Sequence, residues 1–232
     1  TRALEGLPIG IKDENFIKGK PTSNGSPIMK DFVADTTSVG NERILRAGGI
    51  VHARTATPEF SSAGYTHSRL WGVTRNPWNP EFTPGGSSGG SAASLAAGTS
   101  AIATGSDIGG SIRIPAGTCG LVGYKPPYGR NSDDPPFNLD FYCHTGPLAR
   151  NVSDAILLQN VMCGPHPKDM ASLRPKLRLP AHYPAIKDWK IAFSMDLGFF
   201  EVDPDVQKNT LNALDVFRDL GATVEEVEIG WD

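Results

Sequence analysis

Short apolar runs alternate with amphipathic stretches along this chain, and the two patterns predict strands and helices respectively. Strands are expected at 9–12, 50–54, 101–104, 121–124, 190–194 and 223–229. Helices are expected at 41–47, 89–97, 153–162 and 204–220, most of them with a capping serine or aspartate before them or a glycine after them. Strands that alternate with helices at this spacing are typical of α/β architecture.

Loops rich in proline and polar residues separate these elements and suggest the domain organisation. Residues 164–190 contain five prolines and no periodic pattern, which is typical of a connector. We therefore expect a core domain at 1–163, a connector at 164–189, and a strand-helix-strand unit at 190–232 that begins the C-terminal part of the same domain. The long loop at 57–83 is expected to pack beside a functional site, and the loop at 126–145 is expected to lie on the surface.

Composition limits the class of protein. Of the 232 residues, 39% are hydrophobic, which is enough for a packed core, and no run is long and apolar enough to cross a membrane. The net charge of −3 comes without a basic stripe, so neither nucleic acid nor a membrane is an expected partner. The three cysteines, an odd number at unrelated spacings, favour a reducing compartment, and we expect a cytoplasmic location.

The chemistry is concentrated in residues 84–113. Two serines with glycine neighbours, Ser87 and Ser111, lie 111 − 87 = 24 residues apart, and a small-residue helix and a short strand join them. Glycines on either side of a nucleophilic serine allow the backbone to approach a reacting carbonyl closely. The strand at 101–104 would deliver Asp107 to Ser111 at its C-terminal end, which is where ligands bind in open α/β sheets.

Four segments carry a resemblance to a known family. They are Gly85 to Gly90, Ser106 to Ser111 with the sequence SDIGGS, Gly6 to Asp13 with the sequence GLPIGIKD, and Gly146 to Arg150 with the sequence GPLAR. Together they resemble the amidase signature family, whose members hydrolyse amides with a Ser, Ser, Lys triad. The resemblance covers nearly all of this chain and implies a mixed, twisted β-sheet with helices on both faces. Because family members are usually longer at both ends, this chain is expected to be a part of that fold.

The resemblance also assigns roles to individual residues. It implies that Ser111 is the nucleophile, that Lys12 is the base, and that Ser87 relays protons between them. It implies further that the Gly86-Ser87 peptide bond is cis. The backbone N–H groups that the resemblance assigns to the oxyanion hole are those of Ile108, Gly109, Gly110 and Ser111.

Three further residues are expected to give structural support, on grounds that do not depend on the resemblance. Asp107 and Arg113 lie close in sequence and are expected to brace the Ser111 turn as an ion pair, and the Ser88 hydroxyl is expected to cap or satisfy local backbone.

Lys12 can accept a proton only when its amine is neutral. A free lysine has a pKa of about 10.4, but burial can lower that value by several units. The apolar run Ile9-Gly10-Ile11 before Lys12 makes burial credible. We therefore expect activity to fall on acidification, as Lys12 becomes charged.

The expected function is cleavage of a carboxamide C–N bond through a serine acyl-enzyme, with a small-molecule amide as ligand and no metal or cofactor. Two alternatives stay open: a truncated binding remnant without catalysis, and an amidotransferase subunit that hydrolyses glutamine. A homodimer is left open as an assembly. The aromatic residues Trp71, Trp78, Phe137, Phe141 and Tyr142 suggest either an apolar pocket or ordinary core.

Three other types of site fit the sequence less well. Gly85 to Gly89 matches the Gly-x-Ser-x-Gly elbow of α/β hydrolases, but the proline-rich residues before it cannot form the internal strand that the elbow needs. His144, His166 and His182 lie in loop-like sequence without an orienting acid. The glycine cluster lacks the ending of a P-loop, and the five histidines are too scattered for a helical metal-binding pair.

The Lys125-Pro126-Pro127-Tyr128 run departs from the Lys-Pro-Thr or Lys-Pro-Ser run that is frequent in the family.

Overall fold

The computed structural model describes residues 1–230 and divides the chain into two compact units, Thr1–Ala181 and a second from His182 onward. The division lies inside the segment predicted to be a connector. Residues 231 and 232, the end of the predicted third region, lie outside the described residues. The assignment of the second unit to the same domain as the first stays a prediction.

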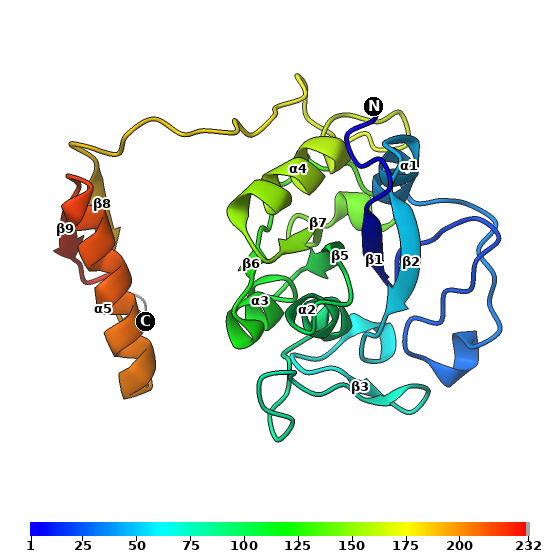
Figure 1. Cartoon of the computed structure of the whole chain (residues 1–232), viewed down its shortest axis with the longest axis horizontal. Helices are drawn as coiled ribbons and strands as arrows, with labels where there is room; N and C mark the ends of the chain where they lie inside the picture. The colour runs from blue at the N-terminus through cyan, green and yellow to red at the C-terminus, as the bar shows by residue number, and fades with distance from the viewer. Residues whose placement is uncertain (231–232) are drawn as a thin grey trace. The chain divides into compact units, whose positions relative to one another are not determined.

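The first unit is built on one five-stranded mixed sheet with the strand order β2-β1-β5-β7-β6 (Figure 1). Its strands are β1 (Pro8–Lys12), β2 (Ile50–Thr55), β5 (Ile102–Asp107), β6 (Val122–Gly123) and β7 (His144–Ala149). Strand β1 runs parallel to β2 and β5, whereas β7 is antiparallel to β5 and β6. The predicted α/β class with a mixed sheet is confirmed.

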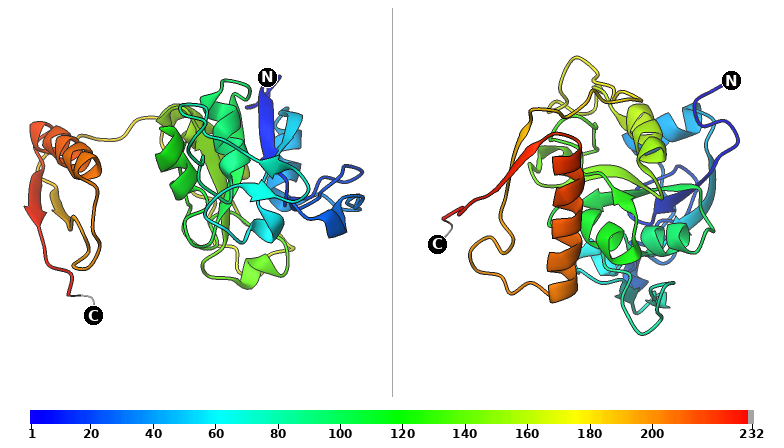
Figure 2. Two further views of the ribbon diagram at one scale, coloured as in Figure 1. Left: turned by 90° about the horizontal axis from the view of Figure 1, so that it is seen from below. Right: turned by 60° about the vertical axis from the view of Figure 1, so that its left-hand side comes forward.

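Helices cover both faces of this sheet, as predicted (Figures 1 and 2). Successive residues of a strand point to opposite faces, and β5 and β7 show the consequence. Ile102 and Ala149 pack in one apolar cluster with residues of α1 (Val39–Arg46) and α4 (Val152–Met162). Their neighbours Ala103 and Leu148 pack in a second cluster with α2 (Gly89–Ala96) and α3 (Arg113–Cys119).

One strand of the main sheet and one helix of the first unit are absent from the sequence-based expectation. Strand β7 begins in the last two residues of the loop predicted at 126–145 and continues to Ala149, and it pairs with β5 over six residues, from Ile102↔Ala149 to Asp107↔His144. Its Gly146 and Pro147 are residues that usually argue against a strand interior. Helix α3 has only seven residues and contains Pro115 and Gly117, so no helical period is visible in its sequence.

Two of the helix caps expected from the sequence were wrong, namely Ser153 for the helix at 153–162 and Ser88, which with Ser87 was a candidate cap for the helix at 89–97; the expected cap Asp203, followed by Pro204, is described below. The predicted cap Ser153 lies inside α4, and the N-cap is Asn151, whose side chain accepts a hydrogen bond from the Asp154 N–H. Ser88 occupies the N-cap position of α2 without a side-chain cap bond. Its hydroxyl is used elsewhere, because it bonds both the backbone N–H and the carbonyl of Ser106 on β5, each at 3.3 Å.

The loops of the first unit contain only short elements. The 57–83 loop holds the two-stranded pair β3 (His67–Ser68) and β4 (Gly72–Val73). Single 3-10 turns occur at Pro27–Met29, Glu59–Ser61 and Phe137–Leu139.

The second unit is a strand-helix-strand unit of the predicted type. Strands β8 (Lys190–Phe193) and β9 (Thr223–Glu226) pair in parallel, and α5 (Pro204–Asp219) joins them and contacts β9 (Figure 2). The Asp203 side chain accepts a hydrogen bond from the Asp205 N–H, and Pro204 follows at the first helical position, as predicted.

The described part of the chain has three free cysteines, of which Cys119 and Cys163 are buried. None of the helices formed within residues 1–230 has the length and apolar character needed to cross a membrane.

Asp107 organises the turn that joins β5 to α3. Its fully buried carboxylate accepts hydrogen bonds from the backbone N–H groups of Gly110, Ile112 and Arg113, at 2.8, 3.1 and 3.2 Å. The Arg113 guanidinium adds two more bonds of 2.9 Å. Burial opposes the charged form of Asp107, but Arg113 and the backbone donors outweigh it and hold the pKa of Asp107 well below its ordinary value.

Helix α2 lies unusually close to neighbouring backbone. A Cβ atom added to Gly90 would lie 2.3 Å from the backbone nitrogen of Ala56, in the segment that follows β2. The Gly90 N–H donates to the Ala56 carbonyl at 3.1 Å. The absence of a side chain at position 90 therefore lets the helix settle against this segment and sets the position of the residues just before the helix.

We expect Gly90→Ala to lower the free energy of unfolding by about 1–3 kcal/mol, because backbone atoms must move to admit the methyl group. Gly117→Ala is the matched control: it also places alanine in a helix, but nothing lies within 4 Å of the added Cβ. That variant should be neutral or more stable by about 0.5–1 kcal/mol. Urea unfolding of both variants checks the expectation, and equal effects at the two positions would contradict it.

We also expect Asp107→Asn to lower the free energy of unfolding by about 1–3 kcal/mol at pH 7, because backbone donors lose their acceptor. The pKa of Asp107 is lower in the folded than in the unfolded chain, so its contribution is complete above about pH 4 and is lost as pH falls through the folded value. The gap between variant and parent should therefore shrink below about pH 4. A gap that widens on acidification, measured by urea unfolding, would sink this expectation. The exposed Asp31→Asn change should stay within about 0.5 kcal/mol throughout.

Candidate active site

Three polar segments meet at one edge of the sheet. Strands β1 and β5 are parallel, so their carboxyl ends lie at the same edge. Lys12 is the last residue of β1, and Asp107 is the last residue of β5. Ser87 is not part of a strand. It reaches the same edge because it lies just before α2, and α2 packs against β1 and β5.

Lys12 is the centre of this polar group. It is 0% exposed, and its Nζ lies 2.6 Å from Ser87 Oγ, 2.8 Å from Ser106 Oγ and 3.3 Å from Glu14 Oε2. Its backbone N–H donates to Thr104 Oγ1 at 3.1 Å, which holds the end of β1 against β5. The predicted meeting of Lys12 with Ser87 is therefore observed, and burial of Lys12 is complete.

The electrostatic surroundings of Lys12 act in two directions. Burial lowers the pKa of Lys12 because the charged amine loses its hydration, while Glu14 in particular, and Asp107 more weakly, favour the charged form. The net direction for the pKa of Lys12 is downward, and the neutral amine is more accessible than in a free lysine. Burial also opposes the charged form of Glu14, but Lys12, Ser106 and Ser61 outweigh it, so that the pKa of Glu14 is lowered.

The Gly86-Ser87 peptide bond is cis, as predicted. Thr66 holds the surrounding loop: its hydroxyl donates to the Gly85 carbonyl at 2.9 Å and accepts from the Gly89 N–H at 3.1 Å. Nothing in the sequence around Thr66 indicates this contact, because it depends on the path of the long 57–83 loop.

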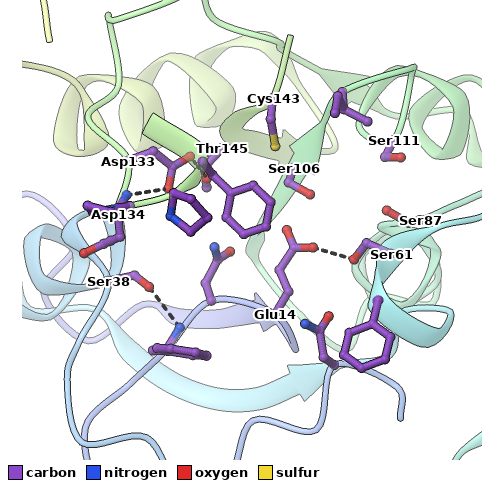
Figure 3. A pocket seen from close by; sticks show the side chains of 18 residues that line it. Glu14, Ser38, Ser61, Ser87, Ser106, Ser111, Asp133, Asp134, Cys143 and Thr145 are labelled. Atoms are coloured by element: carbon purple, nitrogen blue, oxygen red, sulfur yellow. Dashed lines mark hydrogen bonds between the residues drawn. The ribbon is translucent and has the colours of Figure 1, made fainter. Parts of the chain in front are cut away.

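Ser111 lies in the turn between β5 and α3 and is partly buried. Its carbonyl accepts a hydrogen bond of 3.2 Å from the Ser88 N–H, so the two glycine-rich segments are joined directly. Ser111, Ser87 and Ser106 line the same pocket (Figure 3). Within residues 1–230, no hydrogen bond joins the hydroxyls of Ser87 and Ser111 in this arrangement.

The proposed oxyanion segment is only partly available. The Gly110 N–H donates to Asp107 Oδ1 at 2.8 Å, so it is committed to the turn. Gly110 has φ +124°, a conformation that favours glycine, and an added Cβ would lie 2.7 Å from Ile114 Cδ1. Ile108 and Gly109 are exposed, and Lys125 Nζ lies 3.3 Å from the Ile108 carbonyl and 3.5 Å from Asp107. The departure from the family at Lys125-Pro126-Pro127 thus lies beside this turn.

The pocket has a volume of about 380 Å³. Three residues with carboxyl groups, Glu14, Asp133 and Asp134, line it together with polar and aromatic residues (Figure 3). Of the five aromatic residues singled out in the sequence, only Phe137 lines the pocket, and the other four are more than half exposed. The full lining is Glu14, Asn15, Phe16, Asn24, Ser38, Phe60, Ser61, Ser87, Ser106, Ile108, Ser111, Asp133, Asp134, Pro135, Pro136, Phe137, Cys143 and Thr145.

Two further groups of the pocket have shifted pKa values. Burial raises the pKa of Asp133 to about 6, although Thr145 Oγ1 and the Asp134 N–H donate hydrogen bonds to its carboxyl group. Burial also raises the pKa of Cys143 to about 12, so this thiol stays protonated and is a poor nucleophile. Among residues 1–230, no group of three or more His, Cys, Asp or Glu side chains is arranged to hold a metal ion.

Similarity to known proteins was found at the level of sequence. The family model described as Amidase matches residues 1–230. The chain is 40% identical over 231 residues to the A-type subunit of the glutamyl-tRNA(Gln) amidotransferase of Methanosarcina barkeri, and the match covers 97% of this chain and 48% of that protein. The chain thus spans about half the length of the curated relatives it matches.

Solved structures agree with this result. A bacterial aryl acylamidase of the amidase signature enzymes superposes with a TM-score of 0.92 and 34% identity, over 99% of this chain and 49% of that one. The A-type subunit of the Thermotoga maritima glutamyl-tRNA(Gln) amidotransferase superposes with a TM-score of 0.89 and 32% identity, over 97% and 50% of the two chains. From the match over residues 1–230 and these superpositions, the chain belongs to the amidase signature family.

Proposed function

We propose that this chain carries the catalytic core of an amidase that cleaves a carboxamide through an acyl-enzyme on Ser111, releasing ammonia or an amine and a carboxylate. The observation that carries the proposal is the 2.6 Å hydrogen bond between the buried Lys12 amine and Ser87, at the wall of a pocket that Ser111 also lines. A serine needs a nearby base to become a nucleophile, and a neutral buried amine can be that base.

In the proposed reaction, Ser111 Oγ attacks the carbonyl carbon of the amide while its proton passes to Ser87, whose own proton passes to Lys12. The tetrahedral intermediate then collapses as the leaving nitrogen takes a proton back along the same path, and the C–N bond breaks. Water repeats the sequence on the Ser111 ester and releases the carboxylate. Both formation and hydrolysis of the Ser111 ester need Lys12 to be neutral at the start and charged while the tetrahedral intermediate exists.

We further propose that the oxyanion is stabilised by backbone N–H groups of the 108–111 segment. Ile108, Gly109 and Ser111 are the proposed donors. Gly110 can join them only if its N–H leaves Asp107, so its contribution is proposed to be indirect: it shapes the turn. Ser88, Asp107 and Arg113 are proposed to support that turn through the hydrogen bonds described above.

A second candidate function is that of an amidotransferase component that hydrolyses glutamine and passes ammonia to a partner enzyme. The curated relatives favour it, since those with about 40% identity are named as A-type subunits of glutamyl-tRNA(Gln) amidotransferases. The aryl acylamidase favours the stand-alone amidase. A panel of amides that includes glutamine, assayed with the full-length protein, separates the two, together with the presence or absence of copurifying partner chains. We propose the cytoplasm as the compartment, supported by the three free cysteines.

We expect Ser111→Ala to lower ammonia release from the best amide of that panel by at least about 10³-fold, because the acyl-enzyme cannot form. The matched control is Ser153→Ala, which removes an exposed hydroxyl on α4. A Ser111→Ala protein that is folded and as active as the parent would exclude Ser111 as the nucleophile.

We expect kcat/KM to fall as pH is lowered, because protonation removes the neutral Lys12 amine. The lowered pKa of Lys12 means that the neutral fraction at pH 7 exceeds that of a free lysine, and this fraction still decreases toward acid pH. A rate profile between pH 5 and pH 9 measures this. Asp133, with its pKa raised to about 6, titrates in the same range, so Asp133→Asn is the control. A profile that stays flat down to pH 5, or an acid limb that vanishes in Asp133→Asn, argues against Lys12 as the base.

A further inference from the structure

Glu14 is the closest carboxylate to Lys12, and the proposed triad gives it no role. It lies two residues beyond Lys12, its side chain is only 16% exposed, and its Oε2 is 3.3 Å from Lys12 Nζ. The Ser61 hydroxyl donates a hydrogen bond to the same carboxylate (Figure 3). Two groups therefore fix the Glu14 carboxylate: the Lys12 amine, and the Ser61 hydroxyl of the 59–61 turn.

The contacts of Lys12 Nζ determine where the amine, once neutral, can direct its N–H groups and its lone pair. A neutral amine has two N–H donors and one lone pair, and Nζ has three oxygen neighbours, from Ser87, Ser106 and Glu14. Serine hydroxyls can donate or accept, but an ionised carboxylate can only accept. Glu14 must therefore receive an N–H from Lys12. If Ser106 receives the second N–H, the lone pair faces Ser87, which is the direction that proton transfer requires.

We propose that Glu14 is a positioning residue, whose carboxylate holds an N–H of Lys12 so that the amine lone pair points to the Ser87 hydroxyl. This inference rests on the proposed function, because it assumes that Ser87 delivers its proton to Lys12. Glu14 does not touch the reacting serine hydroxyl in this arrangement, so it acts through Lys12.

The same contact affects the titration of the base. Glu14 favours the charged form of Lys12 and so opposes the lowering of the Lys12 pKa by burial. The other charged group that acts on Lys12 is Asp107 at the end of β5, which favours the charged form more weakly than Glu14, whereas the Cys143 thiol just before β7 stays protonated and carries no charge. Asp133 and Asp134 line the pocket without an ion pair to Lys12. Removal of the Glu14 charge should therefore move the Lys12 pKa downward.

The test is the pH dependence of kcat/KM for Glu14→Gln in the full-length protein, with the best amide of the panel as substrate. The midpoint of the acid limb should move to lower pH by about one unit, since an opposite charge at this distance shifts a pKa by that order. The plateau rate should fall by about tenfold, because an amide can also present its own N–H to the amine and turn the lone pair away. A purely structural role for Glu14 would lower the rate without moving the midpoint.

Two variants separate Glu14 from general pocket charge. Asp133→Asn removes a pocket carboxylate that has no ion pair to Lys12. It should not move the midpoint of the acid limb to lower pH. Glu81→Gln removes an exposed carboxylate outside the pocket and should match the parent in both rate and midpoint. An unmoved midpoint in Glu14→Gln, or an equal downward shift in Asp133→Asn, overturns the inference.

Two more variants protect the test against misfolding and against failure of the proposed function. Should Glu14→Gln not fold, Ser61→Ala loosens the same carboxylate and should give a smaller shift in the same direction; no shift there overturns the inference. Ser111→Ala reports on the proposed function separately. If Ser111→Ala is inactive and the Glu14→Gln midpoint is unmoved, only the role of Glu14 fails. If Ser111→Ala is as active as the parent, both fail.

Discussion

A fully buried lysine at the end of a central strand is the constraint on which the rest of the active-site edge depends. An isolated ammonium group in a protein interior is costly, so a buried amine must find hydrogen-bond partners or lose its proton. Lys12 has both options available, because two serine hydroxyls and one carboxylate surround Nζ within 3.3 Å. The strand that carries it lies between β2 and β5, α2 packs against this strand, and the Lys12 side chain is 0% exposed.

Close packing of small residues brings those partners to the lysine. Gly90 lets α2 approach the backbone of Ala56, and a Cβ on Gly105 of β5 would lie 2.6 Å from Leu148 and 2.8 Å from the Ser88 hydroxyl. The helix that follows Ser87 can therefore lie directly on the strands that hold Lys12 and Ser106. Asp107 completes the edge by ordering the next turn, so that Ser111 faces the same pocket as Ser87.

The pocket combines this edge with a second set of charges. Glu14, Asp133 and Asp134 give it an acidic character, while Phe16, Phe60 and Phe137 supply apolar surface. The carboxyl group of Asp134 is tied to the N-terminus of α1 through the Val39 N–H at 2.8 Å, and Asp133 is tied to Thr145 of β7. Asp133 and Asp134 therefore help to hold the walls of the pocket in place, whereas Glu14 contacts the Lys12 amine.

By itself, the sequence determined the chemistry-bearing residues and most of the regular elements. The resemblance to the amidase signature family predicted Lys12, Ser87 and Ser111 as one site, and the structure brings Lys12 and Ser87 into contact and Ser111 into their pocket. The same resemblance implied the cis bond before Ser87, whereas the Asp107–Arg113 ion pair was expected because the two residues are close in sequence. Motif residues and periodic segments are readable because their signal is local: a glycine-rich turn or a helical period lies within a few positions of the chain.

Tertiary structure alone decided the remaining features, because they depend on residues distant in sequence. Strand β7 forms because β5 offers it a partner, despite Gly146 and Pro147. The Ser88 hydroxyl bonds β5 instead of capping α2. Thr66 and Ser61 reach the site from a loop whose path no local pattern reveals. Glu14 is only two residues from Lys12, but their contact matters because elements distant in sequence bury the amine, and one carboxylate acts strongly on a buried amine.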